Sequence, residues 1–230
     1  MESFSDFASA ADSFIWSPYL LIPALIGTGI ILTIRLGAIH LVKLGPALRL
    51  GLIDRNDEDA EGDITNYQAL ATALAATVGV GNIVGVATAI GLGGPGALFW
   101  MWVTGLLGMA SKYSEAFLGV KYRQVDAAGE QSGGPQYYLR KAIPNGFGKT
   151  LGNLFAVFAA LAAFGIGNLT QGNAVASNLE NSFDIDPTLS GMIMFILVGA
   201  ALMGGIKSIG RITAGFVPMM ICLLYTSDAA

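Results

Sequence analysis

The chain of 230 residues is 53% hydrophobic and only 12% charged, and its mean hydropathy is +0.61. Soluble globular domains carry about a quarter charged residues, so the composition indicates a membrane protein whose partner is the lipid bilayer. The net charge of −4 and the lack of basic runs exclude nucleic acid as a partner. Because Cys222 is the only cysteine, an internal disulfide and a thiolate metal site are excluded. Because His40 is the only histidine, a Ser-His-Asp triad is improbable.

The apolar stretches predict an all-α, polytopic bundle of membrane helices, with residues 1–230 forming a single transmembrane domain. They cover residues 14–34, 66–92, 96–119, 150–183, 188–206 and 212–225. Most reach the length of about 20 residues that a crossing helix needs, whereas the last, with about 14, is incomplete. No Lys or Arg precedes the first stretch, so we expect it to stay as an anchor and not to be cleaved as a signal peptide.

The Lys and Arg residues predict a multi-pass protein of the cell (inner) membrane with its N-terminus outside. If the chain reverses direction at each stretch, the connections that hold Lys or Arg all fall on the inner side: 35–55, 121–149 and 207–211. The outer segments 1–13, 92–95 and 184–187 hold neither residue. This distribution follows the positive-inside rule. Near the predicted outer boundary lie four rings typical of an interfacial aromatic belt: Trp16, Tyr19, Trp100 and Trp102.

The second stretch, 66–92, predicts a discontinuous helix. As one helix it would be about 40 Å long, against a hydrocarbon core of roughly 30 Å. Gly79, Gly81 and Gly85 each lower helix stability by roughly 1 kcal/mol relative to alanine, and Asn82 needs hydrogen-bond partners at membrane depth. We therefore expect the helix to unwind around Thr77 to Asn82.

An unwound segment would expose carbonyl groups at the end of one half-helix and N–H groups at the start of the next. The carbonyl end attracts a cation such as Na⁺, and the N–H end attracts a carboxylate. A zwitterionic amino acid would fit between them. Tight helix packing through the Gly81-x-x-x-Gly85 pattern is an alternative of about equal weight on physical grounds, and Asn82 favours the binding site. Dinucleotide binding is dismissed, because no strand precedes these glycines and no acidic residue follows at the required distance.

The fourth stretch, 150–183, is rich in amides. Asn168, Gln171 and Asn178 are spaced to share one helical face and could point at the break, with Gln171 the best placed. For any one of them, an interhelical hydrogen bond of about 0.6 kcal/mol is the alternative role. Elsewhere, three further features are expected: an ion pair between Lys112 and Glu115, a surface helix over 133–144, and a solvated His40.

At this point the segments "ALAATVGVGNIVGVATAI" and "GGPGALFWMWVTGLLGMASKYSEAFLGVKYR" resemble the alanine or glycine:cation symporter family, also called sodium:alanine symporters. "GGPQYYL", "GNLTQGNAVASNL" and "GGIKSIGRIT" extend the resemblance to about residues 14–220. It implies a LeuT-type fold, in which one extra helix precedes two inverted five-helix repeats. Because members are roughly twice this long, the chain is expected to hold the extra helix and the first repeat, with 226–230 a truncation or artefact tail.

The resemblance also implies site residues. In the wider fold, the N–H groups of Val80 and Gly81, beside Gly79, bind the substrate carboxylate, and the Thr77 carbonyl lies near the amine. Na⁺ is implied near the carbonyls of Ala75 and Val78. Thr77 and Asn82 are implied as further sodium neighbours. Within the narrower family, Gln171 is expected to touch the substrate.

The predicted function is sodium-coupled import of small neutral amino acids such as alanine or glycine by alternating access. Na⁺, or in some members H⁺, is the coupling ion, and no other cofactor is expected. A rival from another class is a channel or structural membrane subunit that uses the glycines for helix packing. An enzyme lacks support, because no stretch carries a paired Asp, a His or a Ser-Lys arrangement.

Overall fold

The computed structural model describes residues 2–54, 62–125, 127 and 129–227. Helices account for about 83% of the chain, and the two strands in the described part form one antiparallel pair, β1 (Gln124–Val125) with β2 (Gln131–Ser132). The all-α prediction is therefore confirmed. The acidic connection at 55–61 and the last three residues of the expected tail, 228–230, lie outside the described residues.

The helices follow one another with short connections. In chain order they are α1 (Glu2–Ile15), α2 (Leu21–Arg35), α3 (Ile39–Val42), α4 (Leu44–Leu52), α5 (Asn66–Thr77), the π-helix η1 (Gly81–Gly85), α6 (Val86–Gly93), α7 (Pro95–Lys121), α8 (Pro135–Ala142), α9 (Asn145–Phe164), the π-helix η2 (Gly165–Leu169), α10 (Thr170–Phe183), α11 (Pro187–Met203) and α12 (Gly205–Ser227).

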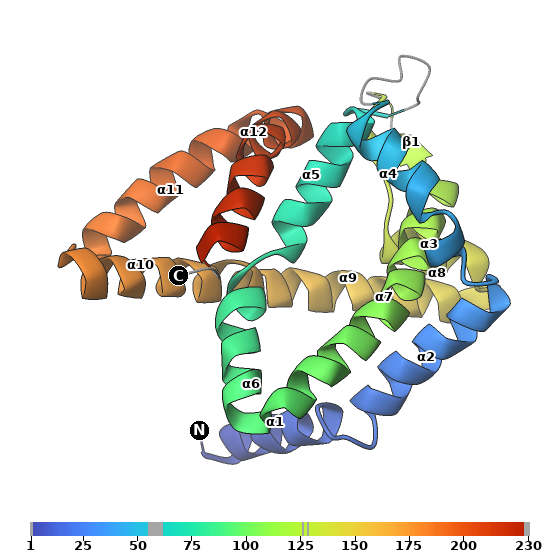
Figure 1. The fold of residues 1–230 in the computed structure, drawn as a ribbon. Coiled ribbons are helices and arrows are strands. Elements are labelled where there is room, and N and C mark those ends of the chain that lie inside the picture. The colour runs from blue at the N-terminus through green and yellow to red at the C-terminus, as the bar shows by residue number, and fades with distance from the viewer. Residues whose placement is uncertain (1, 55–61, 126, 128, 228–230) are drawn as a thin grey trace.

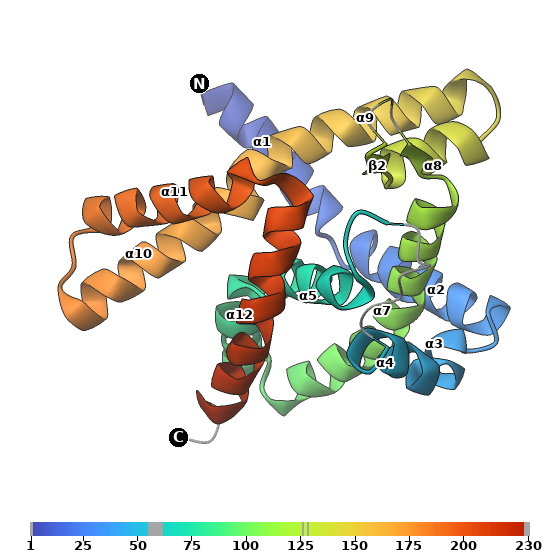
Figure 2. The same ribbon diagram turned by 90° about the horizontal axis from the view of Figure 1, so that it is seen from above.

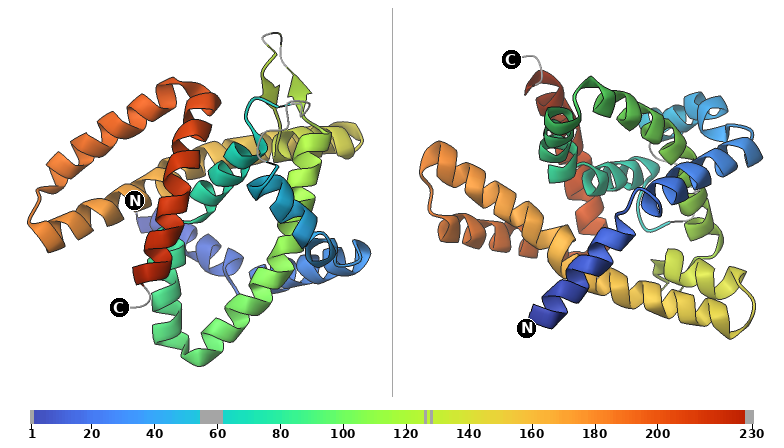
Figure 3. Two further views of the ribbon diagram at one scale, coloured as in Figure 1. Left: turned by 45° about the horizontal axis from the view of Figure 1, so that its top comes forward. Right: turned by 90° about the horizontal axis from the view of Figure 1, so that it is seen from below.

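The helices α9, η2 and α10 form one long rod, and the other helices form an open frame beside it (Figure 1). α11 doubles back beside α10, and α12 then turns toward α5 (Figure 1). Seen from above, α12 crosses α5 in contact with it, and α8 lies beside α9 (Figure 2). α2 packs across α7, and α6 meets α7 at a sharp corner (Figure 3). The break between α5 and α6 thus lies where the frame meets the rod.

Two helices in the described part are long and apolar enough to cross a bilayer: Asn145–Phe183, with 39 residues, and Gly205–Leu224, with 20. The bent pair Asn66–Thr77 and Gly81–Gly93 makes a third if it counts as one span. α2 and α11 are apolar but shorter, with 15 and 17 residues. α7 has 27 residues but is not sufficiently apolar, because tryptophans and an ion pair interrupt its apolar run.

The predicted ends of the first and last stretches are wrong. The first, 14–34, is divided by a turn at Pro18, and the expected outer segment before it forms α1. Proline lacks an N–H group, which favours a break there. The last helix begins at Gly205 and not at 212, so Lys207 and Arg211 lie in its first turns and not in a loop. Long basic side chains can extend from a helix end to the interface, so their charge does not mark a loop.

The half-helix α5 is fastened to α12. The Thr72 and Thr213 hydroxyls form a hydrogen bond of 3.0 Å, and the Tyr67 hydroxyl donates to the Ala214 carbonyl at 3.3 Å. A Cβ on Gly210 would lie 3.2 Å from the Ile64 side chain, so the glycine permits close approach. The other half-helix, α6, contacts α7 instead. The two halves of the broken helix therefore belong to different neighbours.

Three secondary expectations have clear outcomes. The helix expected over 133–144 is present as α8, which packs on α9 where a Cβ on Gly152 would lie 2.8 Å from the Gln136 carbonyl oxygen; its place at the membrane surface stays a prediction. The Lys112–Glu115 ion pair is also confirmed, with an N–O distance of 3.4 Å. The expectation of a solvated His40 is met only in part: the residue is half-buried, and its Nδ1 atom is buried with no hydrogen-bond partner in the described part of the chain.

Asp186 caps the start of α11 and makes its stability depend on pH. Hydrogen bonds from the side chain and N–H of Thr188 and from the N–H of Leu189 lower the pKa of the Asp186 carboxyl. A lowered pKa stabilises the fold above the unfolded value, near 3.9, and the stabilisation is lost as the pH falls through the folded value. We expect the Tm to fall more steeply between about pH 5 and about pH 3 in the wild type than in Asp186→Asn, which keeps the capping oxygen. Equal slopes in thermal unfolding would contradict this.

Candidate functional site

The helix break predicted within 66–92 is present. α5 ends at Thr77 because Val78 adopts an extended conformation, with φ −84° and ψ 115°. The chain becomes helical again as η1, a π-helix that continues into α6. The half-helices before and after the break are bent by 58°. π-Helical turns are rare and are frequently found at functional sites.

Three N–H groups at the break donate outside the helical ladder. Gly79 donates to Asn82 Oδ1 at 3.2 Å, and Val80 donates to Gln171 Oε1 at 3.1 Å. Asn82 donates its own N–H to the Gly79 carbonyl at 3.0 Å. In an unbroken α-helix these three would bind the carbonyls four residues earlier, which are those of residues 75, 76 and 78. Those carbonyls have therefore lost their helical donors.

Gln171 reaches the break from the rod formed by α9 and α10. It lies in the first turn of α10, directly after the π-helix η2. A Cβ on Gly79 would lie 3.2 Å from Oε1 and 3.3 Å from Nε2 of Gln171. The glycine thus gives the amide the space to approach the main chain. The predicted orientation of Gln171 toward the break is confirmed.

The other two amides of the predicted face do not reach the break. Asn168 lies within η2 and is exposed, because a π-helical turn shifts the angular spacing on which the shared face was predicted. Asn178 follows Gln171 by two turns, and its Nδ2 atom donates to the Ala174 carbonyl of its own helix at 2.7 Å. Only Gln171 of these three residues is positioned to contact a ligand there.

A groove of about 510 Å³ opens at the break. Its lining residues are all uncharged: Ala76, Thr77, Gly79, Val80, Gly81, Asn82, Val84, Gly85, Thr170 and Gln171. Polar character comes from main-chain dipoles, two amide side chains and threonine hydroxyls. An uncharged lining of this kind matches a ligand whose own charges cancel, provided that the half-helix ends face its charged groups.

Most of the predicted site residues line this groove, and two do not. Ala75, in the last turn of α5, and Val78, at the start of the break, are the two predicted carbonyl ligands of sodium, and neither is part of the lining. Four lining residues were not predicted as site residues: Ala76, Val84, Gly85 and Thr170. The signal for Ala76 was available, because its carbonyl is the helical partner of the Val80 N–H group. Thr170 carried no separate signal beyond its position next to Gln171.

The glycine-packing alternative finds no support within the described chain. A Cβ added to Gly81 or Gly85 would meet no other heavy atom within 4 Å, apart from its own helix and neighbours. By contrast, a Cβ on Gly29 of α2 would lie 2.7 Å from Leu107 Cβ on α7, which is what a packing glycine looks like. Gly81 and Gly85 instead border open space in the groove.

Comparison with known proteins decides the family. The family model described as the sodium:alanine symporter family matches residues 1–228. The chain belongs to this family. The sequence resemblance stated above is thereby confirmed.

Several curated relatives of the sodium:alanine symporter family match nearly the whole chain. The sodium/alanine symporter AgcS of Methanococcus maripaludis is 53% identical over 94% of this chain and 48% of its own length. Two Bacillus subtilis proteins, named "Probable sodium/glutamine symporter GlnT" and "Amino-acid carrier protein AlsT", are 35% and 34% identical over 95% and 96% of this chain, and over 44% and 46% of their own lengths. The chain therefore spans about half the length of the curated relatives it matches.

Proposed function

We propose that the protein containing this chain is a symporter that imports a small neutral amino acid, such as alanine or glycine, together with Na⁺. The observation that carries the proposal is the break itself: carbonyls without helical donors on one side and N–H groups directed out of the helix on the other. Family membership and the printed name of the Methanococcus relative support it. H⁺ in place of Na⁺ is the alternative coupling ion.

The substrate carboxylate would bind the N–H groups of Val80 and Gly81, beside the Cβ-free space at Gly79. These groups lie at the N-terminal start of the half-helix Gly81–Gly93, where the helix dipole favours an anion. The substrate amine would lie near the Thr77 carbonyl at the C-terminal end of α5. Gln171 would contact the ligand from α10. The groove of about 510 Å³ has room for a small zwitterionic amino acid.

Na⁺ would bind at the carbonyl end of the break. The carbonyls of Ala75 and Val78 have lost their helical donors, and carbonyl oxygens are the ligands that unwound transporter helices offer to Na⁺. Thr77 and Asn82 would add further oxygens; Asn82 Oδ1 accepts one hydrogen bond at 3.2 Å and keeps a second lone pair. A bound cation would also favour the substrate carboxylate nearby, which couples the two binding steps.

Alternating access would follow from the two attachments of the broken helix. α5 is fastened to α12, and α6 contacts α7, so rocking of one group against the other would open the groove to opposite sides. We propose a LeuT-type fold for the complete protein, with α2 as the extra helix and α5 to α12 as the first repeat. The site would be completed by the second repeat.

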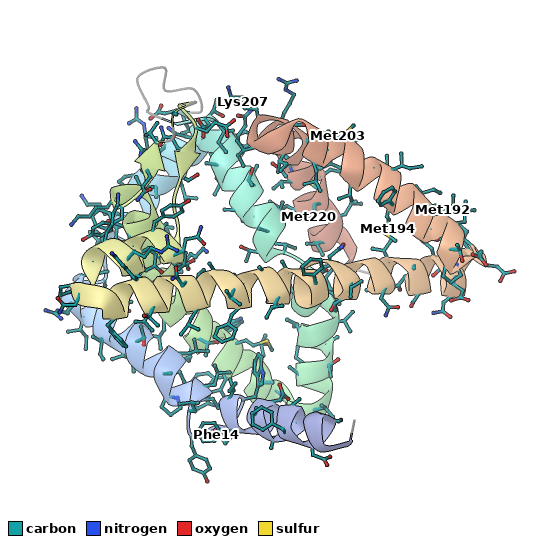
Figure 4. All side chains as sticks on the ribbon, turned by 180° about the vertical axis from the view of Figure 1, so that it is seen from behind. Phe14, Met192, Met194, Met203, Lys207 and Met220 are labelled. Atoms are coloured by element: carbon teal, nitrogen blue, oxygen red, sulfur yellow. The ribbon has the colours of Figure 1, made fainter. Side chains whose placement is uncertain are left out.

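The proposed orientation places the N-terminus outside the cell (inner) membrane. Lys207 at the α11–α12 corner and Phe14 near the N-terminus lie at opposite ends of the molecule (Figure 4). The connections with basic residues also lie together: the Gln131 N–H group donates to Asp63 at 3.1 Å, and Gly210 adjoins Ile64. This grouping is what the positive-inside rule requires of one membrane face.

Uptake of labelled alanine into vesicles that contain the complete protein tests the function. With an inward Na⁺ gradient we expect saturable accumulation above the outside concentration, and with K⁺ replacing Na⁺ we expect the accumulation to vanish. A channel cannot concentrate its solute, so uptake that only equilibrates would favour the channel alternative. Equal accumulation in both salts would remove sodium coupling, and a proton gradient would then be tested as the driving force.

A further inference from the structure

The side-chain oxygen of Gln171 occupies the position that the proposed function gives to a substrate oxygen. Gln171 Oε1 accepts the Val80 N–H group at 3.1 Å across 91 residues of sequence, while Asn82 Oδ1 accepts the neighbouring Gly79 N–H group. These two N–H groups are therefore bound by side-chain amide carbonyls, which resemble one half of a carboxylate in shape and acceptor direction.

We infer that Gln171 is an internal stand-in for the substrate carboxylate, and that a carboxylate must displace it from the Val80 N–H group in order to bind. The inference rests on the proposed function and adds a positioning role for Gln171 in the empty transporter. A symporter changes conformation with its substrate bound, and after release it must return to its starting conformation with the site empty. An unwound segment with a bare N–H group at membrane depth would be destabilised during that return.

Replacement of the Gln171 amide oxygen by the substrate carboxylate is favourable, because the carboxylate is charged and the amide is neutral. A hydrogen bond from an N–H group to a carboxylate is roughly twice as strong as one to a neutral amide. The half-helix dipole and a cation bound at the carbonyl end add to the preference for the charged acceptor. A neutral amide is thus strong enough to hold the empty site in order and weak enough to be displaced.

Displacement also gives Gln171 its contact with the ligand. The amide group carries two N–H donors on Nε2 in addition to its oxygen. Nε2 already lies 3.3 Å from the position of a Cβ on Gly79, within the groove. Once Oε1 leaves the Val80 N–H group, Nε2 can donate to the carboxylate that replaced it. One side chain thereby serves the empty and the occupied site in turn.

Hydrogen exchange of the Val80 amide, measured on the complete protein in lipid nanodiscs, tests the inference. In the wild type we expect slow exchange both without ligand and with saturating alanine and Na⁺. In Gln171→Met, which keeps the length but lacks the acceptor, we expect exchange without ligand to be at least about tenfold faster, and alanine with Na⁺ to restore slow exchange. Asn178→Met, two turns along the same helix, is the matched control and should exchange like the wild type.

The outcomes separate the inference from the proposed function. Slow exchange in ligand-free Gln171→Met would overturn the stand-in role. Fast exchange there that alanine with Na⁺ does not slow would keep the stand-in role and contradict carboxylate binding at Val80. If Gln171→Met does not fold, Gln171→Glu decides, because it keeps an acceptor: we expect Val80 exchange as slow as in the wild type and at least about tenfold weaker alanine binding. Fast exchange or unchanged affinity in Gln171→Glu would overturn the inference.

Discussion

Gly81→Leu is expected to lower the affinity for alanine by roughly 100-fold or more while the protein stays folded in the membrane. A leucine side chain at this position would project from the main chain into the groove that the substrate carboxylate must enter. The added methylenes would block the approach of the carboxylate to the N–H groups of Val80 and Gly81. The affinity is measured by calorimetric titration of alanine in Na⁺ buffer.

Gly81→Leu distinguishes a glycine that borders the ligand from a glycine that is needed for helix packing. A Cβ on Gly81 meets no heavy atom within 4 Å outside its own helix and neighbours, and its φ is not in the left-handed region. Gly91→Leu is the matched control, since Gly91 lies in the same half-helix, also borders open space and does not line the groove. We expect Gly91→Leu to bind alanine like the wild type. Wild-type affinity in Gly81→Leu would show that the glycine does not border the ligand.

The break could be predicted from the sequence because several local signals coincide there. Residues 66–92 are longer than a bilayer requires, and Gly79, Gly81 and Asn82 all disfavour a continuous apolar helix. The break position depends on the main chain of one short segment, which is local information. The structure places the break within the predicted segment, between Thr77 and Gly81.

The pairing of donors and acceptors at the break could not be predicted in the same way. The Val80–Gln171 hydrogen bond joins residues that are 91 positions apart, and the orientation of Gln171 depends on the π-helix η2, whose extra residue per turn has no clear sequence signature. Asn168 was assigned to the wrong face for this reason. The start of α12 was missed because the charges of Lys207 and Arg211 resemble those of a loop, and the burial of His40 Nδ1 depends on tertiary packing that the neighbouring sequence does not reveal.

Val80→Pro is the second substitution with a large expected effect, because it removes one N–H group and little else. Val80 has φ −54° and ψ −36°, which proline can adopt. The preceding residue is Gly79, the type least restricted by a following proline. The N–H group that is lost does not take part in the helical ladder, since it donates to Gln171. The fold should therefore tolerate the proline.

Loss of that N–H group should weaken alanine binding by about 10- to 150-fold, since a hydrogen bond to a charged group contributes about 1.5–3 kcal/mol. Val80→Ala, which shortens the side chain and keeps the N–H group, should retain affinity within about threefold, because it removes only two methyl groups from a half-buried residue and leaves the main-chain donor in place. Both variants should elute like the wild type on size exclusion, which checks that each remains folded.

The most direct test of whether the main chain of the break binds the substrate is the affinity for alanine in saturating Na⁺. It is measured for Val80→Pro and compared with that for Val80→Ala. If the main chain binds the substrate, the proline variant loses at least about tenfold in affinity and the alanine variant does not. If the two variants bind alanine equally well, the carboxylate is held elsewhere and the break is not the substrate site.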